Sequence, residues 1–454
     1  MLIRRTLLYF LLCGLLGAAP SLAAEQPQAS VPPAVWTAHE AVRFALAQNP
    51  DSRIGRQRLI KAQAAIDLAR ASQAPQLTLS SQYSQTNAAM YSFGNILNQG
   101  EFNNSINFNE PGRTDNLGTG LLLGYRLFNG GRDRAGVQAA ESEAEASRME
   151  LAAVHSRLAF EVVRAFYGIS QAEGIIESSQ AAVTAVAASL EVAKTRQEAG
   201  VLLQDAVLDL EVQLSRAKEN LIQGQQALGL ARKVFLTLVG LAEGPTEINW
   251  EAGNEQEVPP PTACGVRFEL KNLEAMINAA EARVRQVKAG AYPAVDGFAG
   301  YSNEQGFITG GSGDSWQAGV KLHYTLYDGH QTRAELARAE AVLGELQEQR
   351  RKITLAIGLE VEQARLALRE TEERLLVTER TIAQAKESAE INRARFSEGV
   401  VMASDLIAVE NRLTEAMVRR TMAQTARRVA TADLRRASGL PQFADLIETP
   451  TTEK

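Results

Sequence analysis

Residues 125–141 read YRLFNGGRDRAGVQAAE, and residues 324–340 read YTLYDGHQTRAELARAE. One constant spacing, with no gap, also relates Tyr125/Tyr324, Leu127/Leu326, Gly130/Gly329, Arg134/Arg333, Glu141/Glu340, Glu191/Glu390, Arg196/Arg395, Gly200/Gly399, Val201/Val400, Glu211/Glu410 and Leu214/Leu413. A repeat of this length predicts two similar structural units that lie side by side or stack. Because no insertion interrupts it, we expect rods of fixed length, whose packing register an insertion would shift.

Each quoted stretch opens a long segment with a helical pattern. No proline occurs in 131–199, which as a helix would be about 100 Å long at a rise of about 1.5 Å per residue. Segment 329–398 also contains no proline and has nearly the same length. Apolar and small residues alternate at steps of four and three along the first segment, as in a coiled-coil seam. They are Leu158, Val162, Ala165, Ile169, Ala172, Ile176, Ser179, Val183, Val186, Leu190 and Ala193. The second segment has a similar stripe at Ile357, Val361, Ala364, Leu368, Leu375, Ile382 and Ala389, interrupted by Thr371 and Thr378.

Glycines mark the ends of these rods. Gly200 and Gly399 supply the positive φ that reverses a chain after a helix. Return helices are predicted over 202–240 and 402–439. We therefore divide the chain into repeat 1 (24–241), a linker (242–265), repeat 2 (266–440) and a C-terminal tail (441–454).

Shorter helices precede each strand region. Thr37 and Glu40 have the spacing of a capping box, and the helix that they start ends at Asn49-Pro50. A second helical pattern covers about 52–73.

A β-hairpin is predicted in each repeat, at about 76–128 and about 294–327. Pro75 and Pro293 precede alternating segments, and the last of these is the clearest. Its apolar face carries Trp316, Ala318, Val320, Leu322, Tyr324 and Leu326; the residues between them are Gln317, Gly319, Lys321, His323 and Thr325. In the first hairpin the two strands flank a polar loop that extends to about Asn116, and this hairpin is the longer of the two.

Alternation alone leaves two interpretations open. A soluble sandwich and a strand of a transmembrane barrel both place apolar residues on one face. The flanking helices favour the barrel, because the sequence offers no other strands against which isolated hairpins could pack.

The first residues indicate export. Arg4 and Arg5 precede a short apolar run, and Ser21 and Ala23 are small residues at the two positions that signal peptidase recognises. We therefore predict a signal peptide over 1–23. Its removal takes away Arg4 and Arg5 and changes the formal net charge from −6 to about −8. This negative charge argues against nucleic acid as a partner. One cysteine, Cys264, then remains, so no intramolecular disulfide can form.

Four strands per chain cannot close a membrane barrel, which needs about eight. Open sheet edges are not tolerated in lipid, because unpaired backbone groups there are costly. If the hairpins lie in a membrane, the protein must therefore oligomerise, with eight strands in a dimer or twelve in a trimer.

The motifs resemble those of the TolC-like outer membrane efflux proteins of Gram-negative bacteria. The resemblance covers about 36–440. It rests on Thr37–Ala41 with Asn49-Pro50, on Pro75 and Pro293, on the two Tyr-x-Leu motifs at 125–131 and 324–329, and on Arg395-Phe-x-x-Gly399 followed by Asp405-Leu406.

The resemblance implies a mainly α fold with a transmembrane β-barrel. Long coiled-coil helices would form an α-helical barrel, and four β-strands per protomer would contribute to a trimeric twelve-strand barrel. It implies a homotrimer in the outer membrane that extends into the periplasm and conducts substrates passively in tripartite efflux or type I secretion. Its partners would be outer membrane lipid, a periplasmic adaptor (membrane fusion) protein and an inner-membrane pump of the RND or ABC type. The alternative is a periplasmic coiled-coil scaffold or adaptor that is not a channel.

The motifs and the resemblance suggest three groups of candidate site residues. Asp405 is expected at the pore constriction as part of an anionic ring, with Asp205 as its counterpart, although either could simply favour a helix N-terminus. Gly200, Val201, Gly399 and Val400 are expected at adaptor-contacting tips, although turn chemistry alone could explain the glycines. Aromatic residues at a membrane interface, or packed under loops, are Tyr83, Tyr125, Phe128, Tyr301, Trp316, Tyr324 and Tyr327.

Catalysis has little support in the sequence. His39, His155, His323 and His330 are scattered and lack the spacing of metal ligands. The glycine-rich stretch 306–313 is followed by a strand rather than by Lys-Ser/Thr and a helix, so it is a poor phosphate loop. We expect no enzyme, no metal and no cofactor.

Overall fold

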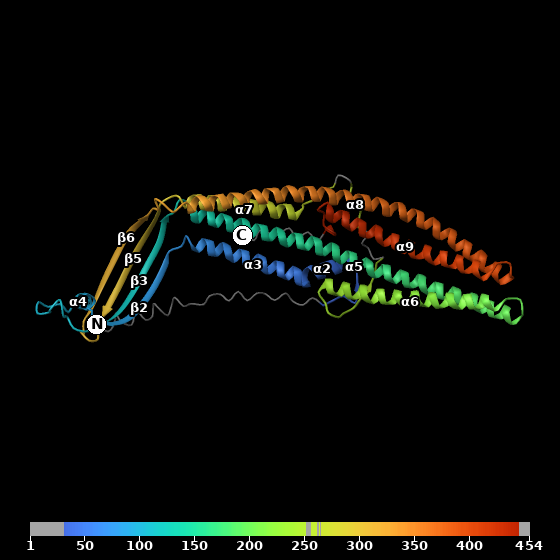
Figure 1. The fold of residues 1–454 in the computed structure, drawn as a ribbon, viewed down its shortest axis with the longest axis horizontal. Coiled ribbons are helices and arrows are strands. Elements are labelled where there is room, and N and C mark those ends of the chain that lie inside the picture. Colours follow the sequence, from blue (N-terminus) through green and yellow to red (C-terminus); the bar gives the residue numbers. More distant parts are fainter. Residues whose placement is uncertain (1–30, 251–255, 261–262, 264, 445–454) are drawn as a thin grey trace.

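The protein is a long rod with a β-sheet at one end (Figure 1). The computed structural model describes residues 31–250, 256–260, 263 and 265–444. The predicted signal peptide (1–23), both cysteines and residues 445–454 of the predicted tail lie outside this part of the chain. Within it, no helix combines the length and the hydropathy needed to cross a membrane.

Two very long helices run the length of the trunk, and shorter helices pack along them. The helices of the trunk are α3 (Pro50–Ala71), α5 (Arg132–Glu198), α6 (Gln204–Val239), α7 (Phe268–Ala289), α8 (Gln331–Glu398) and α9 (Ala403–Ala437). With 67 and 68 residues, α5 and α8 are each about 100 Å long. The bounds of α5, α6, α8 and α9 lie within two residues of the helices predicted from sequence.

The seam residues named above pack the helices together. Every seam position in α5 is buried or half-buried, and so is every position of the stripe along α8. Beside the sheet, the helices lie in the order α3, α5, α7, α8; in the other half of the trunk the order is α6, α5, α9, α8. One edge of the protomer is therefore formed by α3 and α6, and the opposite edge by α8.

A hydrophobic core ties the middle of the trunk together. There α2 (Ala38–Gln48) packs on α5 and α6, and Thr37 and Glu40 form the expected capping box. Trp36 is completely buried; its indole N–H donates to the Pro245 carbonyl at 2.8 Å, and its ring lies against Phe235.

The sheet is antiparallel, with strand order β2-β3-β5-β6. Its strands are β2 (Gln76–Thr86), β3 (Thr114–Phe128), β5 (Ala294–Gln305) and β6 (Ser312–His323). The two predicted hairpins are thus joined through β3 and β5. In this chain β2 and β6 are edge strands, each with one side unpaired.

The structure corrects the sequence analysis at three places in the strand regions. The supposed polar loop of the first hairpin contains a helix, α4 (Ala89–Asn98), whose Ser92 and Ile96 are buried. Strict alternation after Tyr125 would place Leu127 on the same face as Tyr125, but a β-bulge between Arg126 and Phe128 puts Phe128 opposite Val295 instead. The last strand ends at His323, so Tyr324, Leu326 and Tyr327 follow β6 rather than continuing it.

The predicted linker also contains structure. Glu247–Ile248 (β4) pairs in parallel with Val35–Trp36 (β1) in a separate two-stranded sheet, whereas the large sheet has the four strands expected from the sequence. Strands of two residues have too few positions to show a period, which is why the alternation pattern did not reveal them.

Candidate functional site

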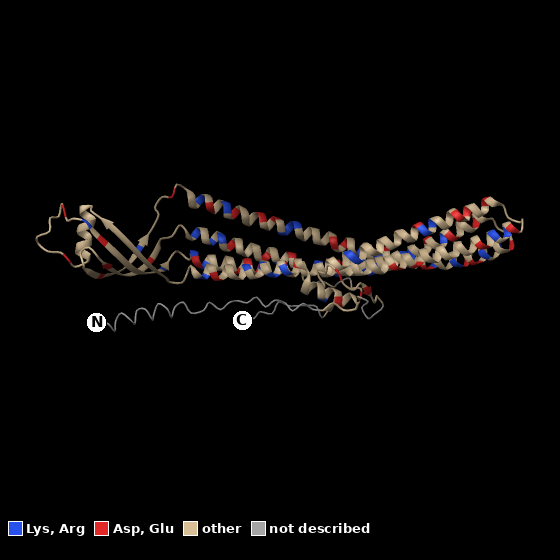
Figure 2. Cartoon of the chain, turned by 90° about the horizontal axis from the view of Figure 1, so that it is seen from below, with Lys and Arg blue, Asp and Glu red and all other residues tan. Residues whose placement is uncertain are grey.

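The register of the sheet separates an apolar face from a polar face, since directly opposed residues share a face. The apolar face carries Leu77, Leu79, Tyr83, Leu117, Leu121, Leu123, Tyr125, Val295, Ala299, Tyr301, Trp316, Ala318, Val320 and Leu322. The polar face carries Thr78, Ser80, Gln82, Asn116, Arg126, Asp296, Ser302, Glu304, Gln317, Lys321 and His323, together with several glycines and two large apolar residues, Leu122 and Phe298. Figure 2 shows how few charges the sheet has compared with the trunk.

All seven aromatic residues expected at a membrane interface are exposed, and they lie at three levels. Tyr301 and Trp316 are register partners on the apolar face. Nearer the trunk are Tyr125, Phe128, Tyr324 and Tyr327. At about 3.3 Å per residue, the segment from Trp316 to Tyr324 is about 26 Å long, and at a strand tilt of about 40° its height is about 20 Å, which fits within the apolar band of about 25 Å in outer-membrane barrels.

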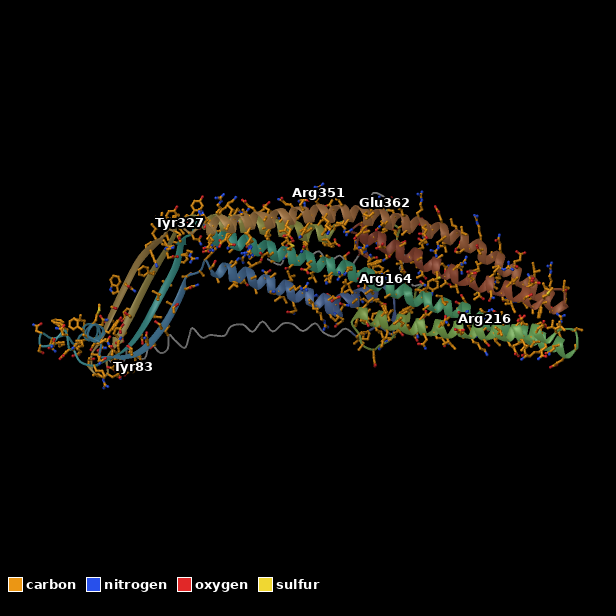
Figure 3. All side chains as sticks on the ribbon, in the orientation of Figure 1. Tyr83, Arg164, Arg216, Tyr327, Arg351 and Glu362 are labelled. Atoms are coloured by element: carbon orange, nitrogen blue, oxygen red, sulfur yellow. The ribbon has the colours of Figure 1, made fainter. Side chains whose placement is uncertain are left out.

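Tyr83 lies apart from both groups, at the end of the sheet furthest from the trunk, hereafter the distal end (Figure 3). A row of polar residues (Ser81, Thr119, Asn303 and Asp314) separates it from Trp316. Its hydroxyl donates to Asp115 at 3.2 Å, and its ring lies 6.2 Å from that of Phe307. This position fits packing under the distal loops better than a membrane interface.

Three of the charged residues on the polar face lie near the trunk, and Glu304 lies near the distal end. Arg126 forms an ion pair with Asp296 at 3.3 Å and also approaches Asp133, the first acidic residue of α5, at 3.7 Å. Lys321 is the register partner of Asp296. This face is therefore mostly polar, which is the chemistry expected of a face that lines an aqueous lumen.

At the opposite end of the trunk, each long helix reverses into its return helix through a glycine. Gly200 and Gly399 have φ of 74° and 87°, in the left-handed region that favours glycine. Val201 and Val400 beside them are 64% and 71% exposed. Their backbone N–H groups cap α5 and α8 by donating to the Arg196 and Arg395 carbonyls at 3.0 and 2.9 Å, while their side chains remain exposed.

Both candidate constriction acids are exposed and lie in the first turns of the return helices. Asp205 is in the first turn of α6, and Asp405 is in that of α9. The Asp205 carboxylate accepts from the Ala206 N–H at 2.8 Å, as a residue serving a helix N-terminus does. The side chain of Asp405 makes no such contact with its own helix.

The tip of the second rod contains a strong ion pair that the sequence analysis missed. Arg393 of α8 donates two hydrogen bonds to Glu410 of α9, at 2.5 and 2.7 Å, and the Glu410 side chain is only 5% exposed. These hydrogen bonds raise the pKa of the Arg393 guanidinium above its ordinary value. Lys194 and Glu211 occupy the equivalent positions in the first rod, 3.6 Å apart and both well exposed.

Contacts also join the two rod tips within the protomer. Arg196 of α5 donates to the Phe396 carbonyl of α8 at 2.5 Å and lies over the Phe396 ring at 5.7 Å. Gln213 of α6 donates to Asn411 of α9. The two coiled coils are thus bonded to each other at the end where the predicted constriction lies.

The two edges of the protomer expose apolar side chains. On the α3 and α6 edge they are Ile54, Ile60, Leu68, Leu208, Val212 and Ile222; on the α8 edge they are Leu355, Leu359 and Leu366. Each edge of the trunk continues into an unpaired edge of the sheet, since α3 leads into β2 and β6 leads into α8. Figure 3 shows Arg351 and Glu362 on the outer side of α8.

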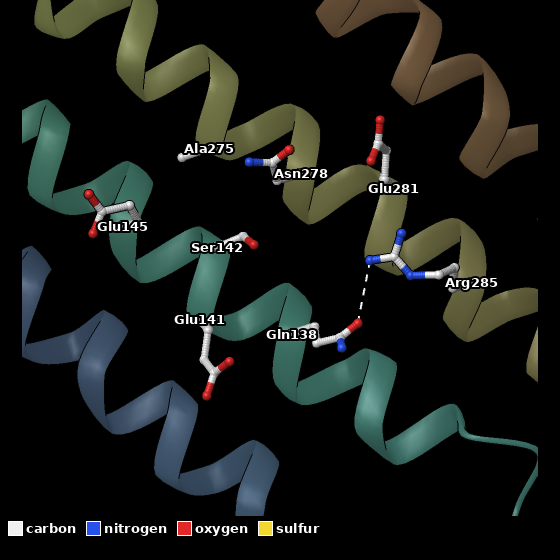
Figure 4. Close-up of a pocket in the computed structure, with 8 residues that line it drawn as sticks. All are labelled: Gln138, Glu141, Ser142, Glu145, Ala275, Asn278, Glu281 and Arg285. Atoms are coloured by element: carbon white, nitrogen blue, oxygen red, sulfur yellow. Dashed lines mark hydrogen bonds between the residues drawn. The ribbon is translucent and has the colours of Figure 1, made fainter.

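The trunk also contains a shallow groove of about 480 Å³ between α5 and α7 (Figure 4). It is lined by Gln138, Glu141, Ser142, Glu145, Ala275, Asn278, Glu281 and Arg285. Arg285 donates to Gln138 across it at 3.4 Å. Within the described residues, no group of three or more His, Cys, Asp or Glu could hold a metal ion.

The family model of outer membrane efflux proteins matches residues 41–240 and 260–440, most of the chain. The chain belongs to this family. Among curated relatives it is 26% identical over 317 residues to the fusaric acid resistance protein FusA of Burkholderia cepacia, over 66% of this chain and 57% of FusA. It is 27% identical over 331 residues to protein CyaE of Bordetella pertussis, over 67% of this chain and 64% of CyaE. The chain thus matches less than two thirds of the length of either relative.

Solved structures agree with the fold of this outer membrane efflux protein. The Campylobacter jejuni CmeC outer membrane channel superposes with a TM-score of 0.79, covering 89% of this chain and 86% of that one. The two sequences are 14% identical. At that identity the similarity concerns the fold alone, and it supports the predicted combination of long helices with a small sheet.

Proposed function

We propose that this chain is one subunit of a homotrimeric outer-membrane channel that passively conducts substrates out of the cell. Membership of the outer membrane efflux protein family supports this proposal. The observation that carries it is the sheet, whose apolar face, polar face and two unpaired edges have no use within a single chain. A scaffold protein would need none of these features.

Pairing between copies would give hydrogen-bond partners to the unpaired backbone groups at the two edges of the sheet. If β2 of one copy pairs with β6 of the next, no backbone edge is left open to lipid. The apolar face then contacts lipid, and the polar face lines the lumen. Because the two edges differ, the contact is head-to-tail, and such contacts form a ring when the rotation closes. Three copies give the twelve strands expected from the family resemblance.

The same head-to-tail contact would build the helical tunnel. The apolar residues on the α8 edge would pack against those of α3 and α6 in the next copy, which buries surface that a soluble monomer rarely exposes. In this assembly residues 24–241 and 266–440 act as two copies of one structural unit, exported by the signal peptide over 1–23.

We assign the narrow end of the tunnel to the tips of the rods. Three copies of Asp405 around the axis would form an anionic ring that attracts cations and selects what passes. Gly200, Val201, Gly399 and Val400 would contact a periplasmic adaptor, and an inner-membrane pump of the RND or ABC type would supply the energy. The name of the relative FusA, a resistance protein, supports efflux of a small toxic compound as one such use.

Planar-bilayer recording of the purified protein tests this function. We expect conductance that prefers cations, and we expect Asp405→Ala to raise the conductance and weaken the cation preference. Asp205→Ala is the matched control and should change neither property, since Asp205 serves its own helix. Absence of conductance from every variant would refute the channel, whereas equal effects of both substitutions would refute the assignment of the ring to Asp405.

A further inference from the structure

The segment between β2 and β3, residues 87–113, forms a structure of its own at the distal end of the sheet (Figure 1). We call it the distal lid. It consists of α4 and the loop that follows, and the second hairpin has no counterpart, since only a short turn joins β5 to β6. The inference below rests on the channel proposed above.

The distal lid lies over the polar face of the sheet. The Asn95 amide donates to Thr114 Oγ1 at 3.0 Å, and the Gln99 amide donates to Asn116 Oδ1 at 3.1 Å. Thr114 and Asn116 alternate with Asp115 along β3, so both belong to the polar face. At Gly313, on the same face of β6, a Cβ atom would overlap the Asn98 carbonyl. Three contacts on two strands therefore place the end of α4 on the side that would face the channel axis.

A cluster of buried polar groups fastens the lid to both hairpins. Gln99 is 1% exposed; its amide also donates to the Asp115 carbonyl at 2.8 Å and accepts from Thr309 at 2.5 Å. Asp115, itself buried, accepts from the backbone N–H groups of Phe307 and Ile308 at 3.0 and 2.7 Å. The bonds to Asp115 join β3 to the turn between β5 and β6, and the bonds of the buried Gln99 attach the lid to both of these segments.

The far side of the lid is apolar and uncovered in one protomer. Phe93, Phe102 and Phe108 form an aromatic cluster with ring centroids 4.6–6.2 Å apart, in which Phe93 contacts the other two rings edge to face, and Phe108 is 59% exposed. Met90 and Tyr91 on α4 are more exposed still. In a ring of copies, lids that cover the lumen side would approach one another around the axis and bury these side chains together.

From this placement we infer that the distal lid is an outer gate, which in the resting state covers the external mouth of the channel through contacts between the lids of neighbouring copies. It is separate from the constriction at Asp405, which lies at the opposite end of the molecule. Passage of a substrate requires the lid to leave the polar face, and the polar cluster around Gln99 sets how readily it does so.

Labelling of a cysteine inside the proposed lumen tests the gate. Ser80→Cys, on the polar face of β2, is the reporter in a chain without native cysteines (Cys13→Ala, Cys264→Ser). Intact cells are treated with a bulky maleimide that cannot cross the outer membrane, so the label reaches the reporter only through the external mouth. The readout is the rate of labelling.

Gly313→Ala is the displacing variant, because its new methyl group would overlap the Asn98 carbonyl. Gly124→Ala is the matched control: Gly124 is also on the polar face, and its Cβ atom would meet nothing within 4 Å. Gln99→Ala weakens the polar cluster without adding volume. We expect Gly313→Ala and Gln99→Ala each to raise the labelling rate about tenfold, since a lost or clashing buried contact shifts local opening by that order.

Replacement of residues 88–112 by a two-residue Asn-Gly turn should give the fastest labelling. Equal rates in all these proteins, or no labelling even without the lid, would overturn the gate. Bilayer recording of the same proteins separates the two proposals: conductance with unchanged labelling refutes only the gate, whereas loss of conductance in every protein refutes the channel itself.

Discussion

The two rod tips offer a matched test of what holds the proposed constriction in shape. Arg393–Glu410 and Lys194–Glu211 occupy equivalent positions in the two halves of the chain, yet their surroundings differ. The Glu410 side chain is 5% exposed and its partner is bidentate, whereas Lys194 and Glu211 are 42% and 46% exposed. We predict that Arg393→Met loosens its tip far more than Lys194→Met loosens the other.

The magnitude follows from burial. Removing one partner of a buried pair costs about 3–5 kcal/mol, because the other charge is left without a partner. Since the Arg393 side chain is 39% exposed, water offsets part of this loss, and we expect about 2 kcal/mol. That corresponds to about 30-fold more frequent opening of the tip. An exposed pair contributes about 0–1 kcal/mol, so Lys194→Met should change opening by about fivefold at most.

Hydrogen–deuterium exchange followed by mass spectrometry measures this opening locally, in the assembled protein. Peptides covering 389–413 should lose protection in Arg393→Met, and those covering 190–214 should change little in Lys194→Met. Arg393→Lys should fall between wild type and Arg393→Met, since it keeps the charge and loses the bidentate geometry. Equal loss at both tips would refute the reasoning, because it would mean that burial of Glu410 does not decide the strength of the pair.

Three further changes test other parts of the structure. Phe166→Ala, in the core at the middle of the trunk, should cost about 3–5 kcal/mol and lower the apparent Tm followed by circular dichroism, because the side chain is 1% exposed. Val320→Arg, on the apolar face, should cost about 2–4 kcal/mol and reduce the yield of assembled protein in membranes, whereas Gln317→Arg on the polar face should not. A loss of yield with Gln317→Arg alone would mean that the polar face, and not the apolar face, contacts lipid. Thr37→Ala removes the cap of α2 and should cost about 1 kcal/mol, measured as faster amide exchange in its first turn; unchanged exchange would contradict the role of the cap.

The long elements could be predicted from sequence because periodicity adds up over length. The steps of four and three extend over about half of α5, a helix of 67 residues, and glycines at 200 and 399 end the two rods. Strand β6 was predicted from its alternation alone. The same rule placed its end too late, because Tyr324 continues the alternation after the backbone has stopped pairing at His323.

Short and tertiary features did not show in the sequence. Helix α4 has 10 residues, and its seat on the sheet depends on Gln99, Thr114 and Gly313, which come from different elements. The parallel pair of Trp36 with Ile248 joins segments that are far apart in the chain.

The Arg393–Glu410 pair, in contrast, could have been found from the sequence. Aligning the halves places Lys194 beside Arg393 and Glu211 beside Glu410, so a cation and an acid recur on either side of both tip turns.

The central claim is that the unpaired edges β2 and β6 are satisfied by neighbouring copies, which makes a closed cylinder of three chains. Native mass spectrometry of the protein extracted from membranes in detergent counts the chains directly. The account predicts particles that contain three chains and no free monomer. A monomer that remains in solution without detergent would contradict it.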